Sequence, residues 1–355
     1  MLTPFLIALT VIQLFGCATS RRLQYPVEPL PYKHEEVEIT VGGGSVKLAG
    51  TITLPHVDHP VPAVILITGS GQQDRNESTV GSRSGHKPFL IISDYLTRQG
   101  IAVFRMDDRG VGGSTGDFGA STIQDFTQDN NAAFDFLSSH PSVDSSRIGL
   151  LGHSEGSLVA SMQAAGNPDI AFVVLMSGVG IHPRQLVELQ TVRTMEAEGY
   201  SDKVNSTLKL QLAAFDILAV SKNDQEIKDK LTTLLLTYGY SASVVERSVK
   251  STISANRIFL ASYVPNRDIA RIKCPVLAIS GSLDVQAPSA ENLAGIRTAL
   301  INGGNNDITT VELDGHNHLL QRAKTGAISE YEKIDETISP IALSAIGEWI
   351  LTKTR

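Results

Sequence analysis

The sequence has few cysteines and no excess of basic residues, and each shortage excludes a class of protein. Its two cysteines, Cys17 and Cys274, form neither a CxxC motif nor a disulfide framework. Lys and Arg number 30 against 37 Asp and Glu, which gives a net charge of -7 and argues against a protein that binds nucleic acid. Cys274 precedes an apolar, β-like run, so we interpret it as a small buried residue.

The chain also lacks internal repeats, low-complexity tracts and a dinucleotide-binding fingerprint. In RGVGGSTGDF, Thr115 stands where the last glycine of G-x-G-x-x-G belongs. His316 and His318 form an H-x-H pair, but no further Cys, His or Asp cluster has the spacing of metal ligands. We therefore expect no metal and no organic cofactor.

The first residues, MLTPFLIALTVIQLFGCATS, form an apolar run that ends in small residues. The run is short for a membrane span and is interrupted by Pro4, Thr10 and Gln13. This pattern is typical of a secretory signal peptide, which we expect over residues 1–16, followed by a linker over residues 17–34.

The segment LFGC, which ends at Cys17, resembles a bacterial lipobox. In a lipobox, cleavage before the cysteine lets its thiol carry a lipid. We therefore expect an exported protein of the cell envelope, lipid-anchored to a bacterial membrane through Cys17. Phe15 is bulky for its position and no basic residue precedes the run, so plain secretion and an uncleaved anchor remain open.

From residue 35 onward, apolar runs alternate with helix-like segments. EEVEITV and SVKLAGTITL flank Gly42–Gly44 with alternating apolar and polar residues, which predicts a β-hairpin. Strands are predicted at PAVILIT, IAVFRMD, RIGLLGH, IAFVVLMSG, PVLAISG and ITTVELD. The alternation predicts an α/β fold: a mainly parallel sheet with helices on both faces and the hairpin at one edge.

The alternation stops between about Ile181 and Ile272, where helix-like segments such as LKLQLAAFDILAV follow one another. We expect residues 181–272 to form an inserted helical cap, and residues 35–180 and 273–355 to form the two parts of the core. An insertion at the C-terminal ends of strands would lie over the ligand crevice. A helical decoration away from the site is the alternative.

Two stretches match G-x-S-x-G, around Ser154 in GHSEG and around Ser114 in GGSTG. A nucleophilic serine needs a strand that stops in a sharp turn, with the serine at its apex and a helix directly after it. Strand-like IGLL precedes Ser154 and helix-like SLVASMQAA follows it, whereas Ser114 lies in a glycine-rich loop with no helix after it. We predict Ser154 as the nucleophile and interpret Ser114 as a flexible loop serine.

The partners of such a serine follow it in the order acid, then histidine. Asp284 comes just after the predicted strand PVLAISG, whereas Asp107 and Asp108 precede the serine and are disfavoured by this order. The histidine is expected after the last strand, where ITTVELDGHNHLLQ offers both His316 and His318. Spacing alone does not separate the two.

An oxyanion hole needs two backbone N–H groups near the nucleophile. One belongs to the residue after the serine, Glu155, and the other to the loop after an early strand. In ITGSGQQDRNES, Ser70 follows Gly69 and is the best candidate. A glycine turn without a catalytic part is the alternative interpretation.

With these residues in place, the chain resembles the α/β-hydrolase superfamily, and more narrowly bacterial serine esterases related to the serine aminopeptidase-like and dienelactone hydrolase-like groups. The resemblance covers about Glu35 to Lys353. It rests on GSGQQDRNES, HKPFLIISDYLTRQGIAVFRMDDRGVGGSTGDF, GHSEGS, CPVLAISGSLDVQAP, GHNHLLQ and EYEKIDETISP. In this group the catalytic histidine resembles the one in NHLLQ, which implies His318 rather than His316.

Some positions depart from the family pattern or receive no role. Ser157 stands where a further glycine is usual, Val264 replaces an aspartate before a proline, and His316 replaces an apolar residue. Packing is the default interpretation for three further residues: Arg75, His86 and Lys87.

We therefore expect a serine esterase that cleaves small-molecule carboxylic esters through an acyl-enzyme on Ser154. A peptidase of the same fold and a non-catalytic envelope binding protein are the alternatives. The predicted cap carries aromatic residues that either line an apolar pocket or form its core: Phe215, Tyr238, Tyr240 and Phe259.

Overall fold

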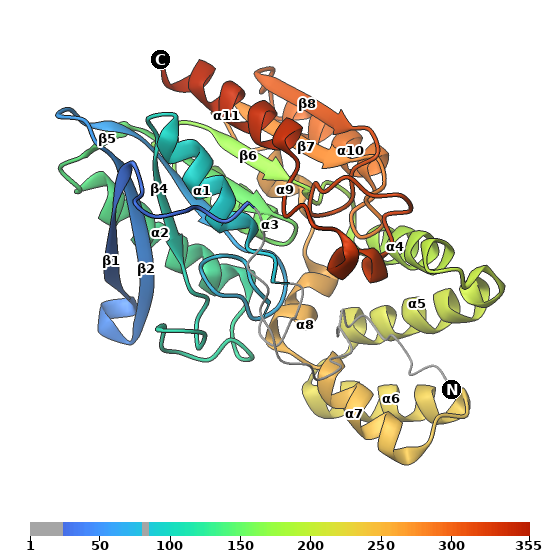
Figure 1. Ribbon diagram of the computed structural model, residues 1–355. Helices are drawn as coiled ribbons and strands as arrows, with labels where there is room; N and C mark the ends of the chain where they lie inside the picture. Colours follow the sequence, from blue (N-terminus) through green and yellow to red (C-terminus); the bar gives the residue numbers. More distant parts are fainter. Residues whose placement is uncertain (1–23, 80–84) are drawn as a thin grey trace.

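A central sheet of eight strands organises the part of the chain that the computed structural model describes, residues 24–79 and 85–355 (Figure 1). In chain order the strands are β1 (Tyr32–Val41), β2 (Val46–Pro55), β3 (Val61–Ile67), β4 (Ala102–Met106), β5 (Val143–His153), β6 (Val173–Met176), β7 (Val276–Gly281) and β8 (Ile308–Leu313). Their order across the sheet is β1-β2-β4-β3-β5-β6-β7-β8. Strands β3 to β8 pair in parallel, whereas β2 is antiparallel to both β1 and β4.

The antiparallel edge forms because three consecutive glycines reverse the chain between β1 and β2. Gly42, Gly43 and Gly44 have φ angles of 60°, 68° and 98°, a region that glycine enters without steric penalty. The resulting register pairs Val41 with Val46. The hairpin predicted from the alternating pattern is therefore confirmed.

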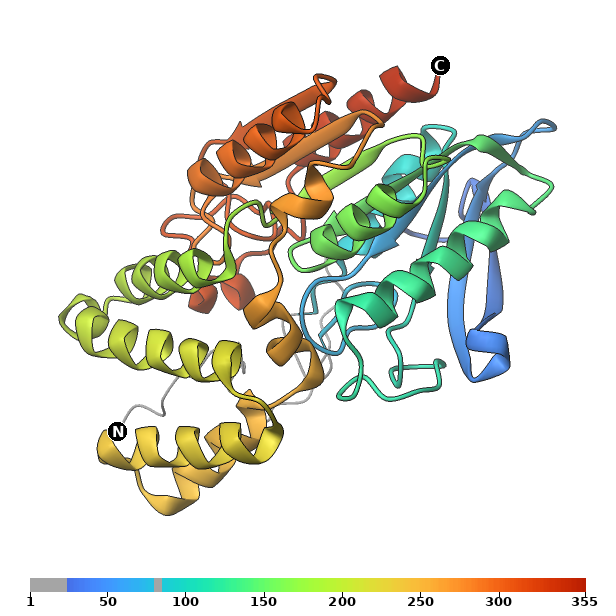
Figure 2. The ribbon, with the colours of Figure 1, turned by 180° about the vertical axis from the view of Figure 1, so that it is seen from behind.

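Helices cover both faces of the sheet, as the two opposite views show (Figures 1 and 2). In chain order the helices are α1 (Pro88–Arg98), α2 (Ile123–Ser138), α3 (Gly156–Gly166), α4 (Pro183–Ala197), α5 (Val204–Val220), α6 (Asp224–Thr237), α7 (Ala242–Thr252), α8 (Ala255–Ser262), α9 (Asn266–Ile269), α10 (Ser289–Asn302) and α11 (Pro340–Thr354). Short 3₁₀ turns are η1 (Gly42–Gly44), η2 (Ser201–Lys203) and η3 (Ile328–Lys333). The mainly parallel sheet with helices on both faces confirms the predicted fold class.

Alternate side chains of the buried strands enter two separate cores, one on each face of the sheet. In β3, Ile65 and Ile67 pack with α2, α3 and α10, whereas Val64 and Leu66 pack with α1 and α11. This follows from the period of two along a strand, since a strand with apolar residues at every position must be covered on both sides.

Helices α4 to α8 lie between β6 and β7 and have a core of their own. Phe215 and Leu231 are buried in this third cluster, which gathers apolar residues from α5 to α8. Tyr240 packs against it, Phe259 packs against the main core, and Tyr238 is exposed. These aromatic residues are therefore mostly structural. Within residues 24–79 and 85–355, no helix has both the length and the hydropathy that crossing a membrane requires.

Candidate active site

Ser154 lies at a sharp turn between the end of β5 and the start of α3. Its φ angle is 54°, a left-handed conformation that costs a non-glycine residue about 1–3 kcal/mol. The backbone N–H of Ser154 donates to the carbonyl of Met176 at the end of β6, over 2.9 Å. The turn therefore presents the hydroxyl at the carboxyl end of the parallel strands, where ligands bind in open α/β sheets.

The two glycines of GHSEG are required by close approach of backbone to backbone. A Cβ on Gly152 would lie 2.2 Å from the carbonyl oxygen of Gly156, and a Cβ on Gly156 would lie 2.3 Å from that of Ile67. No real Cβ tolerates such distances. The motif therefore encodes the tight strand–turn–helix packing that places Ser154.

Ser114 has a structural role that differs from the flexible loop serine expected from the sequence. The residue is 8% exposed, and its hydroxyl donates to the Asp107 carbonyl over 2.9 Å. The same oxygen accepts the N–H of Ala49 in β2 over 3.0 Å. The flexible-loop interpretation is wrong because the glycine-rich loop packs against β2. The two hydrogen bonds of the Ser114 hydroxyl hold the loop to that strand.

Asp284 and His318, which follow β7 and β8, form a buried pair. His318 Nδ1 lies 2.8 Å from Asp284 Oδ2 and 3.0 Å from Oδ1, and both side chains are at most 6% exposed. Asp284 Oδ1 also accepts the N–H groups of Gln286 and Ala287. These donors fix the carboxylate, so Nδ1 of His318 carries the proton toward it and Nε2 remains the free nitrogen.

His316 does not pair with Asp284. Its Nδ1 lies 2.7 Å from the carbonyl oxygen of Asp314, and its buried Nε2 has no hydrogen-bond partner within the described residues. Its own carbonyl accepts the N–H of Leu283 over 2.8 Å, next to Asp284. His316 thus supports the loop that carries Asp284, whereas His318 pairs with that carboxylate.

The serine turn and the histidine loop meet through backbone contacts. The His318 carbonyl oxygen accepts the Ser177 hydroxyl over 2.8 Å and lies 3.1 Å from Nε2 of His153, the residue before Ser154. The rings of His153 and His318 are 4.8 Å apart between centroids. Ser154 Oγ makes no hydrogen bond within the described residues, and catalytic bonds of this kind often tighten only with substrate present.

The two predicted oxyanion donors lie beside the turn. Gly69 lies directly against it, since a Cβ on that residue would be 3.3 Å from the Cβ of Ser154. The N–H groups of Ser70 and Glu155 donate to no other described residue, so both remain available. Gln73 Nε2 donates to the Ser70 carbonyl over 3.0 Å and fixes that peptide.

Asp107 and Asp108, at the end of β4, anchor the loop that carries Ser70. Asp107 accepts the backbone N–H of Arg75 and two of its guanidinium donors over 2.8–3.0 Å. Asp108 accepts the Thr68 hydroxyl over 2.6 Å and the N–H of Gln73 over 2.9 Å. Sequence order disfavoured both as triad acids and did not indicate this anchoring role.

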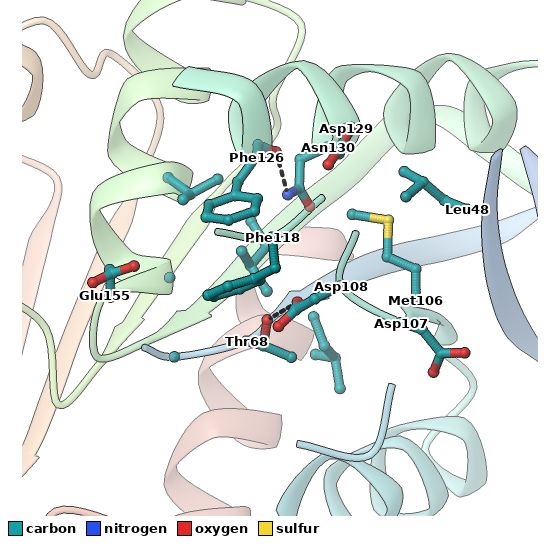
Figure 3. A pocket seen from close by; sticks show the side chains of 15 residues that line it. Leu48, Thr68, Met106, Asp107, Asp108, Phe118, Phe126, Asp129, Asn130 and Glu155 are labelled. Carbon is teal, nitrogen blue, oxygen red and sulfur yellow. Dashed lines mark hydrogen bonds between the residues drawn. The ribbon is translucent and has the colours of Figure 1, made fainter. Parts of the chain in front are cut away.

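A small pocket lies on the α2 and α3 side of the turn (Figure 3). Its volume of about 30 Å³ suits roughly two water molecules. Phe118 and Phe126 form its apolar wall, and the Asp108 carboxyl lies inside, joined to Thr68 by the hydrogen bond drawn. Burial raises the pKa of Asp108 to about 8, with the nearby charge of Glu155 adding to the shift.

The cap contacts the site through α8. Asn256 Nδ2 donates to Glu155 Oε1 over 2.7 Å, and its Oδ1 accepts the N–H of Ile123 at the start of α2 over 3.0 Å. Burial raises the pKa of Glu155, while Asn256 and the nearby Arg257 guanidinium oppose that shift. Asn256 therefore joins α8 to the start of α2 and to the residue after Ser154.

The residues that received no role from the sequence have structural contacts. Arg75 pairs with Asp107 and Glu36, and Lys87 lies 5.4 Å from the ring centroid of Tyr25. His86 is buried and its Nε2 lies 2.8 Å from the Tyr331 carbonyl oxygen. The Thr337 hydroxyl lies 3.1 Å from His86 Nδ1. Cys274 is partly buried, and burial raises the pKa of its thiol to about 11.

Cys17 and the predicted signal peptide lie outside the described residues. Within the described ranges, no three His, Cys, Asp or Glu side chains gather in an arrangement that could hold a metal ion.

The sheet, the serine turn and the acid and histidine at later strand ends together define an α/β-hydrolase fold. The chain belongs to the family described as serine aminopeptidase, S33, whose model matches residues 89–322. That match includes Ser154, Asp284 and His318, and it begins after the loop that carries Ser70.

One relative is esterase EstD of Thermotoga maritima, which is 30% identical to this chain over 196 residues. The alignment covers 55% of this chain and 45% of EstD, so it spans less than half of that protein.

Solved structures show the same fold across most of the chain. An esterase of Pyrococcus furiosus aligns with a TM-score of 0.57 and 17% identity, covering 97% of both chains. Est1E of Butyrivibrio proteoclasticus, determined with ferulic acid bound, aligns with a TM-score of 0.54 and 16% identity over 89% of this chain and 98% of that one. At these identities the likeness concerns the fold alone.

Proposed function

We propose that this protein is a serine esterase that cleaves small carboxylic esters through an acyl-enzyme on Ser154. The observation that carries the proposal is the left-handed turn at Ser154. The ring of the preceding residue, His153, lies 4.8 Å from the ring of His318, whose Nδ1 faces a fixed carboxylate. The names of EstD and of the two structural neighbours support an ester as the substrate class.

In the first half of the reaction, Ser154 Oγ attacks the ester carbonyl while Nε2 of His318 takes its proton. Asp284 holds the imidazole in the required tautomer and stabilises its cation. The N–H groups of Ser70 and Glu155 donate to the oxyanion, a contribution that is commonly the largest electrostatic one. His318 then protonates the leaving alcohol, and the acyl group remains on Ser154.

In the second half, a water molecule replaces the alcohol. His318 takes a proton from that water, and the hydroxide formed attacks the acyl carbonyl. The tetrahedral intermediate collapses, the proton returns to Ser154 Oγ, and the acid is released. Every step uses groups of this chain and water.

Turnover of p-nitrophenyl esters of rising acyl length, beside aminoacyl-nitroanilides, tests the proposal. We expect ester cleavage that Ser154→Ala reduces by about 10³-fold or more. Ser114→Ala is the matched control, because it removes the hydroxyl of the other G-x-S-x-G match and should leave kcat close to wild type.

The family description keeps peptidase activity as the second candidate. Preferential cleavage of the nitroanilides, still dependent on Ser154, would favour it. Absence of turnover on both substrate series would favour the third possibility, a binding protein on this scaffold.

We further propose that the protein is exported and attached to the cell envelope by a lipid on Cys17. The support is the LFGC segment at the end of a short apolar run. In a bacterial host, Cys17→Ser should abolish incorporation of labelled fatty acid and alter processing of the leader. An unmodified mature chain that starts elsewhere, for example near Arg21, would refute the proposal.

A further inference from the structure

Glu77 and His153 form a buried pair that lies outside the proposed triad. Glu77 Oε1 is 2.7 Å from His153 Nδ1, and the two side chains are 3% and 4% exposed. Glu77 adopts a left-handed φ of 62°, so its backbone is held in a conformation that a non-glycine residue rarely takes. Neither residue contacts the substrate in the proposed reaction.

The partners of His153 indicate its protonation state. Nδ1 faces a carboxylate oxygen that already accepts the N–H of Gly69, and Nε2 faces the carbonyl oxygen of His318. A carbonyl oxygen only accepts hydrogen bonds, and so does an ionised carboxylate. With Glu77 ionised, both ring nitrogens of His153 donate, and the side chain is an imidazolium. Burial alone would lower the pKa of His153, but Glu77 and the His318 carbonyl raise it overall.

On one side, the pair fixes the loop that carries the predicted oxyanion donor. Glu77 Oε1 accepts the N–H of Gly69 over 3.1 Å. A Cβ on Gly69 would be 3.4 Å from His153 Nδ1, so the loop lies against the ring as well as the carboxylate. With the Gly69 N–H occupied, the next N–H along the chain, that of Ser70, remains for the oxyanion.

On the other side, the pair fixes the backbone of the proposed general base. The His318 carbonyl oxygen lies 3.1 Å from His153 Nε2 and 2.8 Å from the donating Ser177 hydroxyl. The ring of His318 is held separately by Asp284. His318 is thus fixed at its backbone by one set of donors and at its ring by another.

We propose that Glu77 and His153 are positioning residues, a buried ion pair that keeps the Ser70 loop and His318 at a fixed spacing around Ser154. The inference rests on the proposed esterase function, since it concerns the same site. A displacement of about 1 Å in such a group reduces turnover by about 100-fold. The oxyanion forms in the transition state and the tetrahedral intermediate but not in the bound substrate. Loss of the pair therefore lowers kcat far more than it changes KM.

Three variants each remove a different part of the pair. Glu77→Gln removes the charge with little change of shape. His153→Gln places an amide near the position of Nε2 and keeps a donor for the His318 carbonyl, whereas His153→Asn places one near Nδ1 and keeps a donor for Glu77. We expect kcat to fall about 10- to 100-fold in each, with KM within about threefold of wild type.

Affinity for an aryl boronic acid gives a second readout. Bound to Ser154, the boronate carries an oxygen at the oxyanion position, so its Ki should rise by about the same factor as kcat falls. A purely structural role would not move kcat and Ki together at constant KM.

Asp94→Asn is the matched control. Asp94 on α1 accepts the Tyr32 hydroxyl over 2.8 Å and the Arg98 Nε–H over 2.9 and 3.0 Å, and none of these three residues lines the pocket beside Ser154. The variant should lose stability in thermal unfolding but keep kcat and Ki. Folded Glu77→Gln and His153 variants with wild-type kcat and Ki would overturn the proposal.

The wild-type protein provides a test that needs no variant to fold. In ¹⁵N-histidine NMR at neutral pH, His153 should show two protonated ring nitrogens, and a neutral ring would contradict the ion pair. Failure of the esterase proposal is distinguishable, because it would appear as turnover that Ser154→Ala leaves intact, whatever the Glu77 variants do.

Discussion

Asp107 and Asp108 are neighbours in the sequence, yet their surroundings shift the pKa values of the two carboxyls in opposite directions. Burial would raise the pKa of Asp107, but the Arg75 guanidinium and the N–H groups of Gly113 and Arg75 lower it overall. Asp108 has no such cation, and burial raises its pKa to about 8. At neutral pH, Asp107 is therefore charged and Asp108 is largely protonated.

Asp108→Asn tests this assignment through the pH dependence of stability. Between about pH 4 and pH 8 the folded state binds a proton at Asp108 that the unfolded state lacks, so this group makes stability fall as pH rises, by up to about 1.4 kcal/mol per pH unit. Chemical denaturation at pH 5 and pH 8 should show a smaller loss over this interval in the variant than in wild type.

Asp107→Asn is the contrasting control for that measurement. Because the pKa of Asp107 is lower in the folded state than in the unfolded state, its carboxylate stabilises the fold at pH values above the unfolded pKa. This contribution is lost as pH falls. The variant should therefore be less stable than wild type at pH 7, with the difference shrinking toward pH 3. Equal pH dependence of Asp108→Asn and wild type would contradict a protonated Asp108.

The two histidines of GHNH should behave differently on substitution. His318→Ala should lose about 10³-fold or more of kcat, because it removes the proposed general base. His316→Ala should keep turnover within a few-fold of wild type, because His316 does not pair with Asp284. A dead His316→Ala beside an active His318→Ala would require a different triad.

At the level of elements, the turn between β5 and α3 holds Ser154 in a strained conformation. Ser154→Gly and Ser154→Ala are both expected to be inactive, but glycine tolerates the φ of 54° that alanine resists. Ser154→Gly should therefore be the more stable of the two by about 1 kcal/mol in denaturant unfolding. A less stable glycine variant would show that the turn is not strained.

Local patterns in the sequence predicted individual elements. They did not predict contacts between residues that are far apart in the chain. The hairpin, the parallel strands and the strand–turn–helix at Ser154 follow from runs of a few residues. The Glu77–His153 pair joins residues 76 positions apart, and nothing in either segment marks the other as its partner. Ser114 shows the same limit, because its glycine-rich surroundings predict a loop but not that the loop folds onto β2.

At the scale of the whole molecule, helices α4 to α8 have a core of their own and also contact the sheet domain. Asn256 provides one of these contacts, between α8, the start of α2 and Glu155. Asn256→Ala leaves the Glu155 carboxyl without this donor and the Ile123 N–H without this acceptor.

We expect Asn256→Ala to lower kcat/KM several-fold and to increase amide hydrogen exchange in α8. Ser262→Ala, an exposed position at the end of the same helix, is the control and should change neither. Unchanged exchange and unchanged turnover in Asn256→Ala would show that the cap does not depend on this contact.

Mapping the covalent adduct of a fluorophosphonate probe tests the central claim most directly. The probe reacts with an activated serine, and peptide mass spectrometry locates it. We expect one adduct per chain, on the peptide that contains Ser154, with no labelling of Ser154→Ala and much slower labelling of His318→Ala. An adduct on Ser114 or another serine, or labelling that survives Ser154→Ala, would contradict the assignment of Ser154 as the nucleophile.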